Sequence, residues 1–561
     1  MVFLPPPSVP KLPFDPPDSI TIPEFVFSEK YGRKPLSRSR KPYTCGITGK
    51  SYTTAEVEER EKLLARALAK RLGYDLTDGT EWDRVLALYS LNTIDYIPLT
   101  HAVHRLSGIV TPASAAYSLQ ELQHQLVSSG ANALFTCVPL LDNAVAAAKG
   151  AGIPEDRIFL LPVPGFETKA PFKTINDLIA EGKDAPELKP LNWVKGQGAR
   201  QVAYLCYSSG TSGLPMTIQD GVGRKAAGVD TQVQLGLLPL SHIYGLVPVA
   251  HYGLYNGDET VILPRFELKM LLSAIQRFKI EQMALVPPIM IHMLSSQTEC
   301  AKYDISSVRF IFSGAAPLGK ETMEDLWKVW PKWNICQGYG LTETSPVVTS
   351  TSELDIDAGT SGTLLPGLKA KLIDTDGSEI TEYNKPGELL VQGPTIVLGY
   401  LNNAKATAET FVHHEDGRWM RTGDEVLVRK SPKGNEHFVI VDRIKELIKV
   451  KGHQVAPAEL EAHLLSHPLV SDCAVIQVPD LRAGEVPKAF VVKAPEAKGK
   501  SDDEVKQSIN KFVEEHKAKH KWLKGGIEFI DVVPKSPSGK ILRRLLRDRE
   551  KQARKEKGAK L

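Results

Sequence analysis

The chain has 561 residues, too many for a single hydrophobic core, so two or more domains are expected. Hydrophobic residues make up 42% and charged residues 24%, as in ordinary globular proteins, and the net charge of +3 argues against a nucleic-acid partner. No run of about 18 apolar residues occurs, so no transmembrane segment is predicted. The six cysteines are scattered and lack metal-ligand spacing, which indicates reduced thiols in a reducing compartment.

The first part of the chain alternates between strand-like and helix-like segments. Residues 1–45 are rich in proline and are expected to wrap over the surface. Residues 53–72 predict a helix, because two threonines offer N-caps and apolar residues follow a helical stripe. A second helix is expected at 101–106, and this alternation predicts a mainly parallel α/β architecture. The expected strands are 85–89, 109–110, 132–137, 157–161, 202–206, 260–263, 283–286 and 309–312.

A loop of small hydroxylated residues and glycines, 207–215, follows the strand expected at 202–206. Glycines let backbone N–H groups approach an anion closely, and serine and threonine add short hydroxyl donors. Such a loop suits phosphate, although similar sequences also form plain linkers. It is not a Walker loop, because the Gly-Lys-Ser/Thr ending is absent. The candidate phosphate-binding residues are Ser208, Ser209, Gly210, Thr211, Ser212 and Gly213.

The pattern changes after Trp419 and predicts a small α+β unit at the C-terminus. Charged and apolar residues alternate over 442–451, and a helix is expected to begin at Pro457. We therefore expect an N-terminal domain of residues 1–442 and a C-terminal domain of residues 443–561. The remaining elements expected there are strands at 473–478, 489–493 and 527–533 and a helix at 503–516.

Further motifs follow the phosphate loop in a fixed order. They are Ser-His-Ile-Tyr-Gly at 241–245, Ser-Gly-Ala-Ala-Pro-Leu at 313–318, Gln-Gly-Tyr-Gly-Leu-Thr-Glu at 337–343, Arg-Thr-Gly-Asp at 421–424, Asp-Arg-Ile-Lys-Glu-Leu-Ile-Lys-Val-Lys-Gly at 442–452 and Pro-Ser-Gly-Lys at 537–540. Any one motif alone is a weak signal. Together they resemble the adenylate-forming enzymes, which include acyl- and aryl-CoA ligases, luciferases and peptide-synthetase adenylation domains. The resemblance covers nearly the whole chain, and it is strongest to fungal aryl-CoA ligases of the phenylacetate and 4-coumarate type.

This resemblance implies a fold and a reaction. The fold is a large N-terminal adenylation domain, mainly of parallel sheets in several subdomains, followed by a small mobile α+β domain. In the reaction, a carboxylic acid attacks the α-phosphate of ATP, and the acyl-adenylate then loses AMP to the thiolate of coenzyme A. Both steps require neutralisation of dispersed negative charge. The expected ligands are ATP, Mg²⁺, coenzyme A and an aryl or medium-chain carboxylic acid.

The resemblance also implies catalytic roles. Lys540 is expected to reach the reacting carboxylate and the α-phosphate, because a compact ammonium can follow charge between oxygens. Thr342 and Glu343 correspond to the positions that hold the α-phosphate and Mg²⁺, and a carboxylate suits this hard cation. His242 and Tyr244 resemble the aromatic gate between acid pocket and coenzyme A tunnel. The alternative for a histidine on an apolar turn is a plain core residue.

Other residues correspond to binding positions of the family. The small residues Ala315 and Ala316 are expected against adenine, and Asp424 and Arg443 at the ribose. Lys445 falls at the hinge, and Arg265 at a basic position near the coenzyme A nucleotide. The other expected nucleotide and coenzyme A contacts are Gln337, Gly338, Tyr339, Lys449, Lys451, Gly452 and Gln454, and the expected acid pocket is lined by Tyr244, Gly338, Gly340 and Val347.

The chain departs from the family after Pro215. The family continues Pro-Lys-Gly, a strand and a long helix, whereas Met216 stands here at the lysine position and the strand and most of the helix are expected to be missing. Lys225 would be a substitute cation, but glycine-rich sequence expected to be flexible separates it from the loop. The alternatives are an impaired remnant that binds adenylate or acid, or a mis-spliced reading of an intact gene. A third, delivery to a carrier protein, ranks last because no carrier motif follows.

The last residues, Ala559, Lys560 and Leu561, resemble the small-basic-leucine address of peroxisomal proteins. This resemblance predicts recognition by the peroxisomal import receptor and a location in the peroxisomal matrix. The alternative is a charged helix that ends this way by accident in a cytoplasmic protein.

Overall fold

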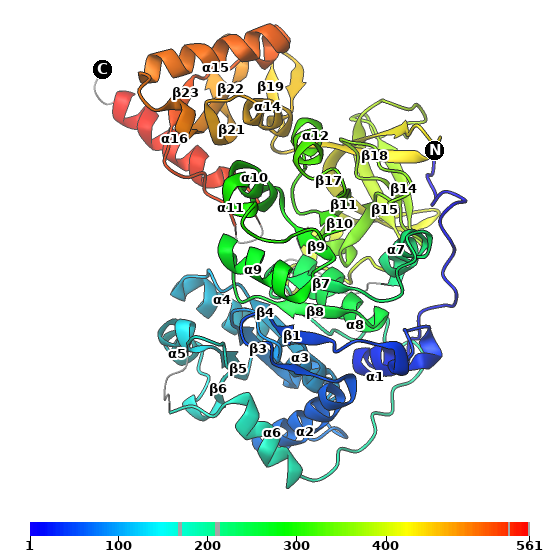
Figure 1. The fold of residues 1–561 in the computed structure, drawn as a ribbon. Coiled ribbons are helices and arrows are strands. Elements are labelled where there is room, and N and C mark those ends of the chain that lie inside the picture. Colours follow the sequence, from blue (N-terminus) through cyan, green and yellow to red (C-terminus); the bar gives the residue numbers. More distant parts are fainter. Residues whose placement is uncertain (167–170, 208–213, 537–538, 559–561) are drawn as a thin grey trace.

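The computed structural model describes residues 1–166, 171–207, 214–536 and 539–558, and Figure 1 shows their arrangement. A large N-terminal part carries mostly parallel sheets with helices around them, and a smaller C-terminal part lies at the top of this view. The predicted fold class is confirmed. Among the described helices, none is long and apolar enough to cross a membrane.

The longest sheet has the strand order β13-β12-β11-β10-β9-β7-β8-β1-β2. Strands β7 to β11 run parallel to one another in this sheet, so their carboxyl ends meet at one edge, where α/β proteins bind ligands. The strands expected at 260–263, 283–286 and 309–312 are confirmed as β8, β9 and β10. The bounds are β1 (Tyr43–Cys45), β2 (Ser51–Tyr52), β7 (Val233–Gly236), β8 (Glu259–Ile262), β9 (Gln282–Leu285), β10 (Phe310–Ser313), β11 (Asn334–Gly340), β12 (Val347–Ser350) and β13 (Thr363–Leu364).

A second sheet, with the order β4-β3-β5-β6, is parallel throughout. Its strands confirm four of the expected runs: β3 (Val85–Tyr89), β4 (Ile109–Ala113), β5 (Ala133–Thr136) and β6 (Ile158–Leu160). Every residue of these strands is buried, as expected of apolar runs in a parallel sheet covered on both faces.

Helix α2 (Thr54–Leu72) shows how local sequence sets the elements around these sheets. The Thr53 hydroxyl accepts from the Glu56 N–H while the Glu56 carboxylate accepts from the Thr53 N–H, which is a complete capping box, and Gly73 ends the helix in a left-handed conformation. The helix predicted at 53–72 is therefore confirmed. The other helices here are α1 (Ile22–Phe27), α3 (Tyr96–His104), α4 (Leu119–Ser129), α5 (Leu141–Gly150), α6 (Ile175–Lys183), α7 (Leu214–Ala226), a π-helix (Gly245–His251), α8 (Tyr252–Asn256), α9 (Leu268–Phe278), α10 (Pro287–Ser295), α11 (Gln297–Cys300) and α12 (Lys320–Val329).

An antiparallel sheet and the C-terminal domain complete the fold. The antiparallel sheet holds β14 (Lys369–Ile373), β15 (Gly387–Gln392), β16 (Phe411–His414), β17 (Gly417–Lys430) and β18 (Glu436–Arg443), with α13 (Ala404–Thr410) beside it. The predicted division at 442/443 falls on the last two residues of β18. The C-terminal domain then contains β19 (Ile448–Val450), β20 (His453–Val455), α14 (Pro457–Leu465), β21 (Val470–Asp480), β22 (Gly484–Lys493), α15 (Asp502–His516), β23 (Ile527–Phe529) and α16 (Arg543–Gly558).

Two expectations were wrong. The run 202–206 is not a full strand: it contains isolated bridges at Tyr204, which pairs with Val110 of β4, and at Cys206. The sequence after Pro215 is not an irregular glycine-rich linker: Leu214–Ala226 forms α7, which begins at the last two residues of the phosphate-loop motif. The Arg224 guanidinium donates to the buried Asp258 carboxylate at 2.9 and 2.7 Å, and this pair anchors the last turn of α7 against its costly glycines.

Candidate active site

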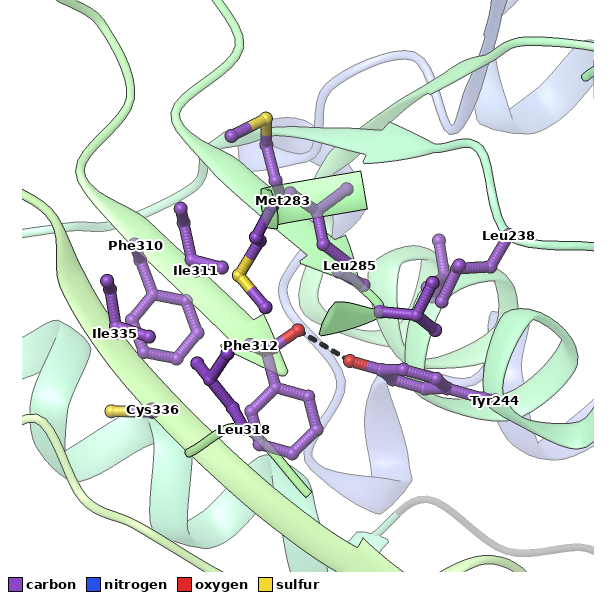
Figure 2. Close-up of a cluster of buried hydrophobic side chains, with 14 of the residues drawn as sticks. Leu238, Tyr244, Met283, Leu285, Phe310, Ile311, Phe312, Leu318, Ile335 and Cys336 are labelled. Atoms are coloured by element: carbon purple, nitrogen blue, oxygen red, sulfur yellow. Dashed lines mark hydrogen bonds between the residues drawn. The ribbon is translucent and has the colours of Figure 1, made fainter. Parts of the chain in front are cut away.

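A tight cluster of aromatic and small residues lies at the end of β10. The Tyr244 hydroxyl donates to the Phe312 carbonyl oxygen at 2.6 Å, and Figure 2 shows the two rings beside each other within the apolar cluster. A Cβ on Gly338 would lie 2.3 Å from Phe312 Cζ, and one on Gly340 would lie 1.8 Å from the Pro346 oxygen, so neither glycine tolerates a side chain. The structure thus brings Tyr244 and Gly338 together around Phe312. Sequence reasoning missed Phe312, although it lies two residues before Gly314.

The expected adenine-binding turn is held in a strained conformation. Ala315 is exposed and has φ +67°, a left-handed value that costs a residue with a side chain about 1–2 kcal/mol. Gln337 Oε1 accepts from the Leu318 N–H at 3.0 Å, and so ties this turn to β11. Gln337 is 6% exposed, which gives it a supporting position beneath Ala315 and Ala316.

Asp424, the expected ribose contact, has a buried carboxylate with defined partners. The Tyr339 hydroxyl donates to Asp424 Oδ2 at 2.6 Å, and Arg443 Nε lies 3.8 Å from Oδ1 across the β17–β18 pair. Burial raises the pKa of Asp424, while the Tyr339 hydrogen bond and the cations of Arg443 and Lys540 oppose this. Three of the expected nucleotide residues therefore meet at one point.

Lys540, which belongs to the C-terminal domain, lies near Asp424 and Arg443. Its turn is closed by the Ser536 N–H, which donates to the Lys540 carbonyl at 2.8 Å, and a Cβ on Gly539 would lie 3.2 Å from Val286 Cγ2 at the start of α10. The turn therefore packs against the N-terminal domain. Burial lowers the pKa of Lys540, and the nearby Arg443 cation lowers it further.

His242 lies within the electrostatic reach of this lysine. Burial lowers the pKa of His242 to about 4, and the Lys540 cation contributes in the same direction, so the imidazole is neutral at neutral pH. The Tyr244 N–H donates to His242 Nδ1 at 3.3 Å, which leaves the proton of the neutral ring on Nε2. The structure thus brings His242 near Lys540, and Tyr244 is joined to His242 by this hydrogen bond.

Thr342 and Glu343 lie in a short 3₁₀ turn, Thr342–Thr344, that follows β11. The Tyr400 hydroxyl donates to Glu343 Oε1 at 2.9 Å, and burial together with this carboxylate raises the pKa of Tyr400 to about 12. No group of three or more His, Cys, Asp or Glu side chains in the described part of the chain is arranged to hold a metal ion. One carboxylate fits Mg²⁺, which proteins often hold through one or two carboxylates together with substrate phosphates.

Other expected residues lie apart from this point. Lys449, Lys451, Gly452 and Gln454 form the β19–β20 hairpin and are exposed, and Lys445 and Arg265 are exposed on loops. Val347 pairs with Gly340 across β11 and β12. The loop residues 208–213 and the terminal residues 559–561 lie outside the described part.

The AMP-binding enzyme family matches residues 34–401, and its C-terminal domain family matches residues 459–540. The chain therefore belongs to the AMP-binding, adenylate-forming enzymes, as an AMP-forming acid–CoA ligase. Acyl-CoA ligase AKT1 of Alternaria alternata is 40% identical, over 98% of this chain and 97% of that protein. Acyl-CoA ligase easD of Emericella nidulans is 37% identical, over 98% of this chain and 100% of that protein.

Solved structures share the fold at lower identity. An anthranilate CoA ligase, AuaEII, in complex with anthranoyl-AMP has a TM-score of 0.78 at 23% identity, covering 95% of this chain and 98% of that one. A benzoate CoA ligase from Burkholderia xenovorans LB400 has a TM-score of 0.76 at 22% identity, covering 94% and 100%. The full-length similarity to acyl-CoA ligases does not favour the alternative of an inactive remnant.

Proposed function

We propose that this ligase activates an aryl or medium-chain carboxylic acid with ATP and Mg²⁺ and transfers the acyl group to coenzyme A. The observation that carries the proposal is the meeting of Lys540 with Asp424, Arg443 and His242: the Lys540 cation lowers the pKa of Asp424 and of His242, and the Arg443 cation, 3.8 Å from Asp424 Oδ1, lowers the pKa of Asp424 and of Lys540. Lysine and arginine cations at this point suit a reaction between a carboxylate and a phosphate.

Each residue of the site has a step to perform. The ammonium of Lys540 binds the acid carboxylate and stabilises negative charge as the carboxylate attacks the α-phosphate. The carboxylate of Asp424, oriented by Tyr339, accepts hydrogen bonds from the ribose hydroxyls. Glu343, oriented by Tyr400, would hold Mg²⁺, which supplies positive charge to the phosphate oxygens when bound.

The preference for an aryl or medium-chain acid follows from the walls of the site. Tyr244 and Phe312, whose rings lie beside each other, would offer apolar surface together with Val347, and the Phe312 ring takes the space that a side chain on Gly338 would need. Such walls discriminate only weakly against shorter acids, because one methylene is worth about 1–3 kcal/mol.

A panel of carboxylic acids tests the proposal through acid-dependent pyrophosphate release and formation of the coenzyme A thioester. We expect aryl or medium-chain acids to give the highest kcat/KM. A strong preference for acetate over every larger acid contradicts the assignment of substrate class. Pyrophosphate release without thioester, even with coenzyme A in excess, contradicts the transfer step and favours another acceptor.

Delivery to peroxisomes is a further part of the proposal, supported by the sequence Ala559-Lys560-Leu561. A fluorescent protein fused ahead of the full chain is expected in peroxisomes, and deletion of the three residues is expected to leave it diffuse. Punctate fluorescence of the deletion variant contradicts this address.

A further inference from the structure

A chain of buried and partly buried hydrogen bonds crosses the N-terminal domain from α2 to the segment that precedes the phosphate-loop motif. Glu61 Oε1 lies 2.7 Å from His101 Nδ1, and His101 Nε2 lies 3.2 Å from His251 Nδ1. His251 Nε2 in turn lies 2.9 Å from the Tyr204 hydroxyl oxygen. Glu61 and His101 are fully buried and Tyr204 is 6% exposed. We call these four residues the Glu61–Tyr204 relay, and the reaction proposed above uses none of them.

Each imidazole of the relay links two partners through its two ring nitrogens. Burial lowers the pKa of His101 to about 3 and that of His251 well below its usual value, so both imidazoles are neutral, with one donor and one acceptor nitrogen each. Burial raises the pKa of Glu61 well above its usual value, and the Arg105 cation, whose Nη2 donates to Glu61 Oε2 at 3.3 Å, opposes this. Because each ring has only one donor and one acceptor, the hydrogen bonds of the relay depend on one another.

The relay connects two segments that border the active site. Tyr204 lies four residues before Ser208, in a segment joined to β4 by the Val110 N–H to Ala203 carbonyl bond of 3.0 Å and the Leu205 N–H to Val110 carbonyl bond of 2.9 Å. His251 is the last residue of the π-helix Gly245–His251, which begins directly after Tyr244. π-Helical turns frequently occur at functional sites.

We propose that the Glu61–Tyr204 relay is a positioning device for adenylation, which fixes the segment leading into the phosphate-loop motif against the π-helix behind Tyr244. Tyr204, His251 and His101 are then positioning residues that touch no reacting atom. A chain of hydrogen bonds among buried and partly buried groups suits this task because a shift of either segment leaves a polar group without its partner. The inference rests on the proposed function, since adenylation is the reaction that the relay positions.

Tyr204→Phe tests the relay, because it removes the hydroxyl and keeps the ring, which lies edge-on to His104 at 4.8 Å. We expect the KM for ATP in pyrophosphate release to rise about tenfold, equivalent to about 1.4 kcal/mol. Conversion of preformed acyl-adenylate to thioester should keep its wild-type rate, which also shows that the variant is folded. His101→Gln should act in the same direction, and the double variant should fall short of additivity because both changes break one chain.

Tyr43→Phe is the matched control. Tyr43 is 1% exposed, and its hydroxyl donates at 3.3 Å to the carbonyl of Ala250, next to His251 but outside the relay. Tyr43→Phe therefore removes a hydroxyl from a tyrosine that is as buried as Tyr204, and the KM of this variant for ATP should stay at the wild-type value. A KM that is unchanged in Tyr204→Phe, or that rises equally in Tyr43→Phe, overturns the proposal.

Calorimetric titration with ATP separates this outcome from failure of the proposed function, because it requires no turnover. A wild-type chain that binds ATP but releases no pyrophosphate with any acid refutes the proposed function. In that case a tenfold weaker ATP affinity of Tyr204→Phe, with Tyr43→Phe unchanged, still supports the relay, and equal affinities refute it.

Discussion

Two faces of the C-terminal domain differ in their relation to the N-terminal domain. The turn that carries Lys540 is packed against the start of α10, and its lysine shares electrostatic interactions with Asp424 and His242. The β19–β20 hairpin, which carries Lys449, Lys451 and Gly452, is exposed, and a Cβ on Gly452 would meet no atom within 4 Å. The C-terminal domain thus places Lys540 at the candidate site and leaves the candidate residues of the β19–β20 hairpin exposed.

From this difference we infer that the observed arrangement serves a single half-reaction. The arrangement fits adenylation, in which a cation is required at the carboxylate and α-phosphate. The hairpin reaches the site only if the domain turns, and the segment between β18 and β19, with the exposed Lys445, is the place where the chain permits it. Variants on the two faces should therefore affect different half-reactions.

The largest effect is expected for Lys540→Ala. Removal of one charge contact to a reacting oxyanion commonly costs about 10²–10³ in rate, so acid-dependent pyrophosphate release should fall by about this factor. Conversion of preformed acyl-adenylate to thioester should be nearly unchanged if the C-terminal domain turns and carries Lys540 away before that step. Lys500→Ala, at an exposed lysine of the same domain, serves as the control. Equal losses in both half-reactions would remove the distinction between the two faces.

The turn that carries Lys540 could be predicted from the sequence because the Pro-Ser-Gly-Lys motif is a contiguous run of residues. In the N-terminal domain, the capped helix α2 and the buried strands of the second sheet are also local patterns, and the structure contains both. Residues 537–538 of the Pro-Ser-Gly-Lys motif lie outside the described part. Local patterns determine turns, caps and buried strands, and these therefore agree with expectation.

Contacts between distant residues could not be predicted in this way. The His101–His251 hydrogen bond joins residues 150 positions apart, and the Tyr244–Phe312 bond joins residues 68 apart. Helix α7 was missed for the same reason: Gly221 and Gly223 disfavour a helix by about 1 kcal/mol each, whereas the Arg224–Asp258 pair that anchors it spans 34 residues. Packing also favours a glycine at 223, because a Cβ there would lie 3.2 Å from Glu353 Oε1, closer than an ordinary contact.

A smaller effect, confined to the other half-reaction, is expected for Gly452→Leu. Gly452 has φ +82° and open space around it, so the leucine strains the turn by about 1–2 kcal/mol without touching the adenylation arrangement. If the hairpin lines the path of the pantetheine arm, the added side chain should slow thioester formation about tenfold. Gly434→Leu is the matched control, since Gly434 has the same φ of +82° and equally open surroundings in the β17–β18 turn. Slower pyrophosphate release, or an equal effect of the control, would contradict this role.

The smallest effect concerns pH, and it again separates the two half-reactions. Lys540 acts as an ammonium, so pyrophosphate release should decline as the pH rises through its pKa, which burial and the Arg443 cation hold below the usual value for lysine. Arg443→Gln removes one cation that disfavours the charged lysine, so the pKa of Lys540 should rise and the alkaline decline should move to higher pH, whatever the variant loses in absolute rate.

The control is Arg482→Gln, at an exposed arginine of the β21–β22 turn, which should leave the pH profile unchanged. The pH profile is measured as log kcat/KM for pyrophosphate release without coenzyme A, so that ionisation of the coenzyme A thiol does not contribute to it. An alkaline decline that Arg443→Gln leaves in place would mean that another group titrates, and that Lys540 is not held beside Arg443 during adenylation.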